Sequence, residues 1–322
     1  MSSLVPLPCL AFNRGKYSDE PILFSISEKK ATPCDMDELT GKTTWATPHG
    51  WFLVRHPAAA AAPPATFLWN PGNGDKIHLP PLREDLSSEC TCLLSDKPDL
   101  SGDGKFVVLL LEKYGPVLWY CHAGADGGDN GGWARHEYDI GTQVLYPDET
   151  LHEKLVITPV AACRGRFYFS TGFEELGVIE FRPATAFSSI AMREVVAGGY
   201  GVADNALVFM VESEGQVHMV NLLFEGSLSS VVYEVSVYRM DFSGRQWRRV
   251  RDLGGRAFLL SSLSFGAARS ADKCGLEQDC VYMSYPWDKS LMIYNVKDGT
   301  MKMESLDGAP ESMRALWMLP TD

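Results

Sequence analysis

The feature that most constrains the fold of this chain is a hairpin pattern that recurs along the sequence. In its clearest copy, at residues 237–253, an alternating apolar and polar run is followed by the turn DFSG and a second alternating run. Alternation with a period of two is the pattern of a β-strand, and Asp with Gly supplies the side-chain hydrogen bond and the positive φ that tight turns use. The stretch therefore predicts two antiparallel strands.

Five further copies of this pattern begin at Leu23, Phe67, Trp119, Val178 and Met292. Their spacing of about 45 to 65 residues is the period of the four-stranded blades of a propeller. We therefore expect an all-β fold, a β-propeller with six four-stranded blades, with seven blades as the alternative count.

The strands predicted by this pattern form five sets of four and a sixth set divided between the two ends of the chain. Pairing of the C-terminal strand with the N-terminal blade would close the ring and leave no exposed sheet edge. Residues 1–322 are thus expected to form a single propeller domain. The strands are predicted at 8–12, 22–27 and 31–34 with 315–319; at 43–48, 51–56, 66–70 and 76–79; at 89–94, 105–112, 117–122 and 134–140; at 157–163, 166–170, 177–181 and 191–196; at 207–212, 216–224, 231–240 and 246–252; and at 257–262, 280–285, 291–296 and 301–304.

Composition and charge exclude several classes of function. No run of eighteen apolar residues is present to cross a membrane, and the N-terminal residues lack the pattern of a signal peptide, so a cytoplasmic or nuclear location is expected. The formal charge of −12 argues against nucleic acid as a partner, because nucleic-acid binders need a basic face.

One dense basic cluster stands out against this acidic background. It consists of Arg245, Arg248, Arg249 and Arg251, with Trp247 among them. A site that stacks a base and binds a phosphate is one interpretation. The alternation favours the other interpretation, a solvated outer strand whose charges protect the sheet edge.

The sequence shows no pattern that indicates catalysis, a metal site or a cofactor. The eight cysteines include no CxxC pair, so reduced structural thiols are expected and no metal or cofactor is predicted. His49, His122 and His136 could each act as a general base, but none has a partner at a fixed spacing. No catalytic residue is therefore predicted.

Several motifs in order resemble the large plant family of F-box-associated β-propellers. The motifs are His-Gly-Trp at 49–51, Asn-Pro-x-x-Gly at 70–74, Leu-Pro-Pro at 79–81 and Leu-Gly-x-Arg-Ala at 253–257, and the resemblance extends over residues 8–320. It implies a propeller that recruits the target of a ubiquitin ligase. The first predicted strand begins about ten residues from Met1, too close for the helical F-box to precede it, so a propeller without an F-box is expected.

These observations favour a non-catalytic module that binds another protein, as a regulator or decoy in protein degradation or signalling, and that is monomeric by itself. Its binding loops are expected at 83–88, 146–154, 173–176, 198–204 and 286–290, with Tyr146, Phe173, Tyr200 and Trp287 as aromatic contacts. The alternative is a propeller-type hydrolase or lyase. Three or more carboxylates and histidines around a deep central pocket would favour that enzyme.

Overall fold

Antiparallel hairpins build nearly the whole molecule, as the alternating pattern predicts. The computed structural model describes residues 5–12, 21–34, 36–57, 64–98, 105–124, 132–144, 150–170, 174–182, 184–193, 205–225, 232–261, 265–285, 288–310 and 315–321. The hairpin at 237–253 is formed by β20 (Val232–Asp241) and β21 (Gln246–Val250), with β21 as the outer strand of its sheet. In its turn, Asp241 Oδ1 accepts hydrogen bonds from the Gly244 amide at 2.9 Å and the Ser243 hydroxyl at 2.7 Å.

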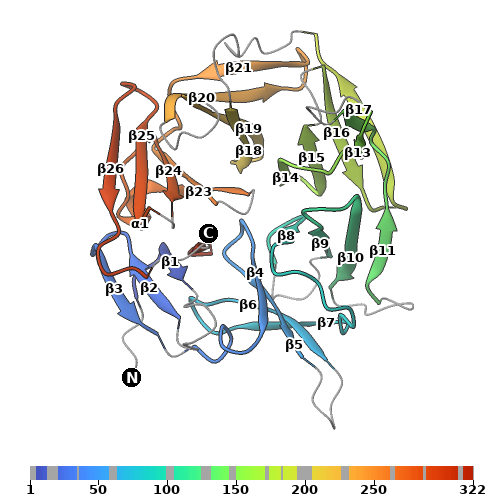
Figure 1. The fold of residues 1–322 in the computed structure, drawn as a ribbon, viewed down its shortest axis with the longest axis horizontal. Coiled ribbons are helices and arrows are strands. Elements are labelled where there is room, and N and C mark those ends of the chain that lie inside the picture. The colour runs from blue at the N-terminus through green and yellow to red at the C-terminus, as the bar shows by residue number, and fades with distance from the viewer. Residues whose placement is uncertain are drawn as a thin grey trace.

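The sheets are arranged around a central axis as the blades of a β-propeller, and the described strands are consistent with six blades (Figure 1). From the axis outward, blade I contains β27 (Ala315–Met318), β1 (Cys9–Phe12), β2 (Ile22–Ser25) and β3 (Lys30–Pro33). Blade II contains β4 (Thr43–Ala46), β5 (Phe52–His56), β6 (Ala65–Trp69) and β7 (Lys76–Leu79). Blade III contains β8 (Thr91–Leu94), β9 (Phe106–Leu111), β10 (Val117–Ala123) and β11 (Ala134–Glu137).

The second half of the chain continues the ring. Blade IV contains β14 (Val160–Cys163), β15 (Arg166–Ser170), β16 (Glu175–Glu180) and β17 (Ala186–Ala191). Blade V contains β18 (Asn205–Ser213), β19 (Gln216–Phe224), β20 and β21. Blade VI contains β23 (Gly266–Ser270), β22 (Arg256–Leu260), β24 (Cys280–Tyr285), β25 (Ser290–Asn295) and β26 (Met301–Ser305).

The two ends of the chain meet in blade I, consistent with the predicted closure. β27 pairs antiparallel with β1, with Leu10 opposite Trp317. The Trp317 side chain is buried, and its Nε1 donates a hydrogen bond to the Leu260 carbonyl oxygen at 2.9 Å. The C-terminal strand therefore holds the N-terminal blade and also contacts blade VI.

Blade VI departs from the predicted four antiparallel strands. β23 is an additional innermost strand, β22 pairs in parallel with β24, and the short helix α1 (Ala271–Cys274) follows β23. β23 also pairs in parallel with β18, which joins blades V and VI into one sheet. The segment has Gly and Ala in place of β-branched residues because space at the axis is small: a Cβ on Gly266 would lie 2.4 Å from Val211 Cγ2.

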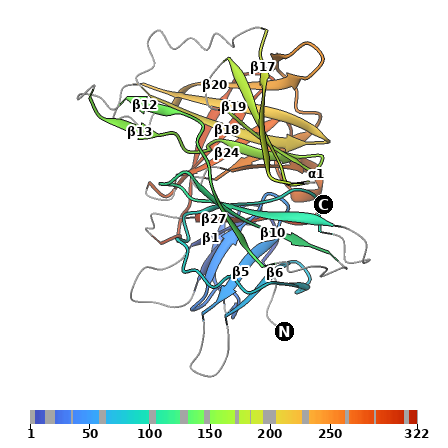
Figure 2. The ribbon, with the colours of Figure 1, turned by 90° about the vertical axis from the view of Figure 1, so that its right-hand side faces the viewer.

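Two other predicted segments differ from the structure. The outer strand of blade IV is β17, Ala186–Ala191, where residues 191–196 were expected, because the exposed sequence there alternates too weakly to fix its limits. A separate exposed hairpin is formed by β12 (Thr142–Val144) and β13 (His152–Lys154). β12 follows the expected strand 134–140, where no strand was predicted, and β13 lies within the expected loop 146–154. This hairpin projects from the face of the ring opposite to α1 (Figure 2).

The hydrophobic core lies between neighbouring blades. One cluster joins blades I, II and VI, and four further clusters each fill a boundary between consecutive blades from II to VI. Trp51 of the His-Gly-Trp motif is buried between blades II and III. This packing fixes the blades as a ring and positions the turns at its two faces. Among the described residues, no helix is long and apolar enough to cross a membrane.

Candidate functional site

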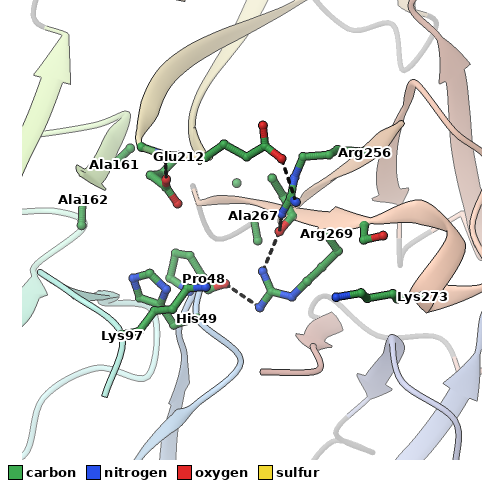
Figure 3. Close-up of a pocket in the computed structure, with 15 residues that line it drawn as sticks. Pro48, His49, Lys97, Ala161, Ala162, Glu212, Arg256, Ala267, Arg269 and Lys273 are labelled. Carbon is green, nitrogen blue, oxygen red and sulfur yellow. Dashed lines mark hydrogen bonds and ion pairs between the residues drawn. The ribbon is translucent and has the colours of Figure 1, made fainter. Parts of the chain in front are cut away.

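A hollow of about 460 Å³, which we call the central pocket, lies where turns and inner-strand ends of blades II to VI converge (Figure 3). It is on the face of the ring that carries α1. Its charged side chains are Lys97, Glu212, Glu214, Arg256, Arg269 and Lys273. Four cations and two carboxylates therefore line the pocket of a chain whose net charge is −12.

The wall contributed by blade II is the turn that contains His49 and Gly50. Gly50 has φ of +83°, and a Cβ at this position would lie 2.7 Å from the Leu319 carbonyl oxygen and 2.9 Å from that of Pro320. Only glycine permits this approach, because any other side chain would collide with the backbone of the C-terminal segment. The His-Gly-Trp motif thus joins blade II to the end of the chain and places His49 at the pocket.

Arg269, at the inner edge of blade VI, holds three parts of the ring together. Its side chain donates to the carbonyl oxygens of Pro320 at 2.8 Å, Pro48 at 2.8 Å and Ala268 at 2.7 Å. Only 3% of the residue is exposed, and Figure 3 shows its guanidinium reaching from β23 toward Pro48. Since buried donors and acceptors are costly to leave unpaired, these contacts give Arg269 a structural role.

The two glutamates of the pocket are Glu212, near the end of β18, and Glu214, in the turn between β18 and β19. Glu212 Oε1 accepts the amide of Gly215 at 2.6 Å, and Glu214 lies 3.6 Å from the guanidinium of Arg256. Arg256 also donates to the Ala268 carbonyl oxygen at 3.3 Å. Glu212 thus stabilises the turn, and Glu214 pairs with Arg256 of blade VI.

Of the histidines considered as bases, only His49 lies at the central pocket. His122 is on β10 with its ring against Tyr120, and His136 is on β11, where it stacks with Phe187. No group of three metal-ligating side chains occurs in the described ranges. All eight cysteines are free thiols, and burial raises the pKa of Cys92 and Cys121 well above the ordinary range of a thiol.

The four aromatic residues predicted as contacts, Tyr146, Phe173, Tyr200 and Trp287, lie outside the described residues. They remain predictions. The strand ends that flank their loops face away from the central pocket, on the side of the β12–β13 hairpin (Figure 2). The one predicted loop described in full, 83–88, is anchored by Arg55, which donates to the Leu82 carbonyl oxygen at 3.0 Å and to Asp85 at 2.8 Å.

Sequence reasoning did not find the central pocket, because one of its walls is β23, a strand that was not predicted. The available signal was the run GAARS, four small residues and one Arg, before the helix residues ADKC. A strand of such small residues is typical of a crowded position near the axis of a ring. An arginine in that setting indicates a buried hydrogen-bonding role.

The sequence profile of the KIB1-4 beta-propeller family matches residues 23–303. No curated protein matches the chain. A solved structure of a protein from Lactobacillus plantarum is 10% identical with a TM-score of 0.42, and the alignment covers 96% of this chain and 99% of that one. A prolyl endopeptidase structure is 12% identical with a TM-score of 0.36, covering 95% of this chain and 40% of that one. The structure of BBS1N in complex with ARL6DN is 9% identical with a TM-score of 0.35, covering 94% and 77%.

Proposed function

Because the chain belongs to the KIB1-4 beta-propeller family, we propose that it is a non-catalytic module that recognises another protein, with the central pocket as its binding site. The observation that carries this proposal is that some charged side chains of the pocket are bonded within the protein and others are exposed to solvent. Glu212 accepts the Gly215 amide in the β18–β19 turn, Glu214 pairs with Arg256 of β22, and Arg269 donates to three carbonyl groups, so these groups are already engaged within the protein. Lys97 and Lys273 are exposed at the pocket and provide charge for a ligand.

The resemblance to the propellers of F-box proteins supports a role in protein degradation or signalling. In this proposal the protein occupies a target as a regulator or decoy, acts in the cytoplasm or nucleus, and is monomeric when alone. The cationic pocket fits an acidic element on the partner, because opposite charges speed association and select the orientation of the complex.

The test is affinity capture from extract of the source organism, with the wild type compared with a Lys97→Glu, Lys273→Glu double variant. The matched control is Lys30→Glu with Arg135→Glu, which makes the same charge change at exposed positions on the outer strands β3 and β11. We expect specific partners to be lost from the first variant and retained by the second. Equal capture by all three proteins would contradict the proposal.

A propeller-type hydrolase or lyase is the second candidate function. Three potential acid or base groups, His49, Glu212 and Glu214, line the central pocket. Three such groups around one pocket are the arrangement expected of a propeller-type enzyme. The pairing of both glutamates argues for the binding module. Turnover of a panel of ester, glycoside and lactone substrates that is abolished by His49→Gln, with the fold intact, would establish the enzyme and replace the first proposal.

A further inference from the structure

A second hollow, of about 820 Å³, lies between blades IV and V on the same face as the central pocket. We call it the arginine groove and define it by Arg164, Arg166, Tyr168, Arg239, Phe242 and Arg248. Its walls come from three turns, those between β14 and β15, between β18 and β19, and between β20 and β21. Gly215 lines both hollows, so the groove adjoins the central pocket.

The charges of the groove are unbalanced. Four arginines and one carboxylate, Asp241, line it. Arg166 pairs with Glu180 at 2.7 Å and Arg248 pairs with Asp241 at 2.7 Å. Within the described part of the chain, neither of the other two arginines, Arg164 and Arg239, forms an ion pair, and both side chains are exposed. Two guanidinium groups are therefore available to a ligand.

The position of Arg164 is set by the backbone beneath it. Gly215 has φ of +73°, and a Cβ there would lie 3.1 Å from both Nε and Nη2 of Arg164. The guanidinium thus rests against the turn between β18 and β19 and loses little freedom when it binds an anion. Planar guanidinium groups bind carboxylate and phosphate oxygens through two parallel hydrogen bonds.

The groove also has an apolar wall. The rings of Tyr168 and Phe242 are 5.3 Å apart and tilted by 55°. Tyr168 is buried, whereas Phe242 is 40% exposed at the tip of the β20–β21 turn. An exposed aromatic ring beside arginines provides contact area for the chain that carries the anionic groups.

We propose that the arginine groove binds a peptide segment of a partner protein that carries clustered anionic side chains. The net charge of −12 disfavours a long polyanion, because the parts of the polyanion that extend beyond the groove are repelled by the acidic surface of the molecule. A short acidic segment is affected mainly by the nearest charges, since screening at physiological salt acts over about 8 Å. Carboxylate and phosphate groups share the chemistry that the arginines recognise, and the experiment separates these two sources.

The test measures fluorescence anisotropy with three labelled peptides of equal length: one rich in Asp and Glu, its Asn and Gln counterpart, and one carrying phosphoserine. We expect the wild type to bind an anionic peptide with micromolar affinity and to ignore the neutral peptide. Substitution Arg164→Gln with Arg239→Gln should weaken binding by at least about tenfold, equivalent to about 1.4 kcal/mol. The stronger of the two anionic peptides identifies carboxylate or phosphate as the preferred group.

The matched control is Arg249→Gln with Arg251→Gln, which removes the same charge from exposed arginines at the end of blade V that do not line the groove. It should retain binding within about twofold, a difference that is small on the free-energy scale. An equal loss in both variants would show that only net charge matters and would overturn the proposal. So would binding of the neutral peptide, tighter binding of a short oligonucleotide, or the absence of binding to both anionic peptides. Variants of Lys97 and Lys273 test the central pocket separately.

Discussion

The central pocket and the arginine groove adjoin each other, and both are rich in cations, yet they use these charges differently. In the central pocket, the Arg269 guanidinium is buried and its donors are bound to backbone carbonyl groups of three segments. In the groove, Arg164 is exposed on the β14–β15 turn and Arg239 is exposed on β20. The comparison shows that residue type alone does not distinguish an arginine that holds the ring from one that can bind a ligand. Burial and hydrogen-bond partners make that distinction.

The largest effect on the region around the central pocket is expected from removal of the closing strand β27. Deletion of residues 315–322 takes away the ladder between β27 and β1 and the buried ring of Trp317. We expect loss of most of the free energy of unfolding, which is about 5 to 15 kcal/mol for a folded domain. Thermal unfolding measures the effect, and deletion of residues 321–322 alone is the control. An unchanged midpoint after the longer deletion would contradict closure by β27.

Replacing the buried Arg269 and the exposed Arg239 with methionine, one at a time, should change the unfolding free energy by different amounts. Arg269→Met leaves buried carbonyl groups without donors and should cost about 4 kcal/mol of unfolding free energy. Arg239→Met, at the exposed groove, should change it by no more than about 0.5 kcal/mol. Chemical denaturation of both variants provides the measurement. Similar values for the two would show that the buried contacts of Arg269 do not stabilise the ring.

A buried histidine on β19 makes the stability of the protein sensitive to acid. Burial against Phe258 and the nearby Arg239 guanidinium lower the pKa of His218 to about 4. The unfolded chain takes up this proton near pH 6.5, so stability is complete above that value and falls as the pH drops toward 4. The loss attributable to this group should approach about 3 kcal/mol.

His218→Phe should reduce this loss, whereas His152→Gln, on the exposed hairpin, should leave it unchanged. Unfolding free energies measured at several pH values between the two limits show the difference. If wild type and His218→Phe lose stability in parallel over this window, the buried histidine is not the origin of the acid sensitivity.

Two glycines with similar backbone angles test how closely the C-terminal segment packs against the turn at Gly50. Gly50 and Gly254 have φ of +83° and +69°, but a Cβ would collide with carbonyl oxygens only at Gly50, and nothing lies within 4 Å at Gly254. Gly254→Ala should cost about 1 kcal/mol, from the left-handed conformation alone. Gly50→Ala should cost about 2 kcal/mol more. Equal costs would mean that the C-terminal segment can move away from the turn.

The repeated hairpins predicted most of the fold because their pattern is local. The turn at Asp241 to Gly244 follows from neighbouring residues, and so does the Asn70 turn, where the side chain accepts the Gly72 amide at 2.9 Å. Gly254 and Gly255, between blades V and VI, both have the positive φ that glycine adopts readily, and Asp279 accepts the Leu253 amide at 2.7 Å.

The inner strand β23 could not be predicted in the same way. Its residues 266–270 have low strand propensity, and they form a strand because β18 and β22 lie on its two sides. The groove was missed for a similar reason. The cluster from Arg245 to Arg251 was correctly interpreted as an outer strand, but Arg248 joins residues of blade IV that are distant in the sequence. Contacts between blades are not visible in a local pattern.

The position of the C-terminal residues has a practical consequence for anyone who attaches a tag or a reporter to this protein. The Pro320 carbonyl is bound by Arg269 and packed against Gly50, so Thr321 follows directly from the wall of the central pocket. A fusion that continues from Thr321 would start beside the opening, where it could obstruct a ligand and pull on the closing strand. A label on the β12–β13 hairpin, at the opposite face, would leave both hollows accessible.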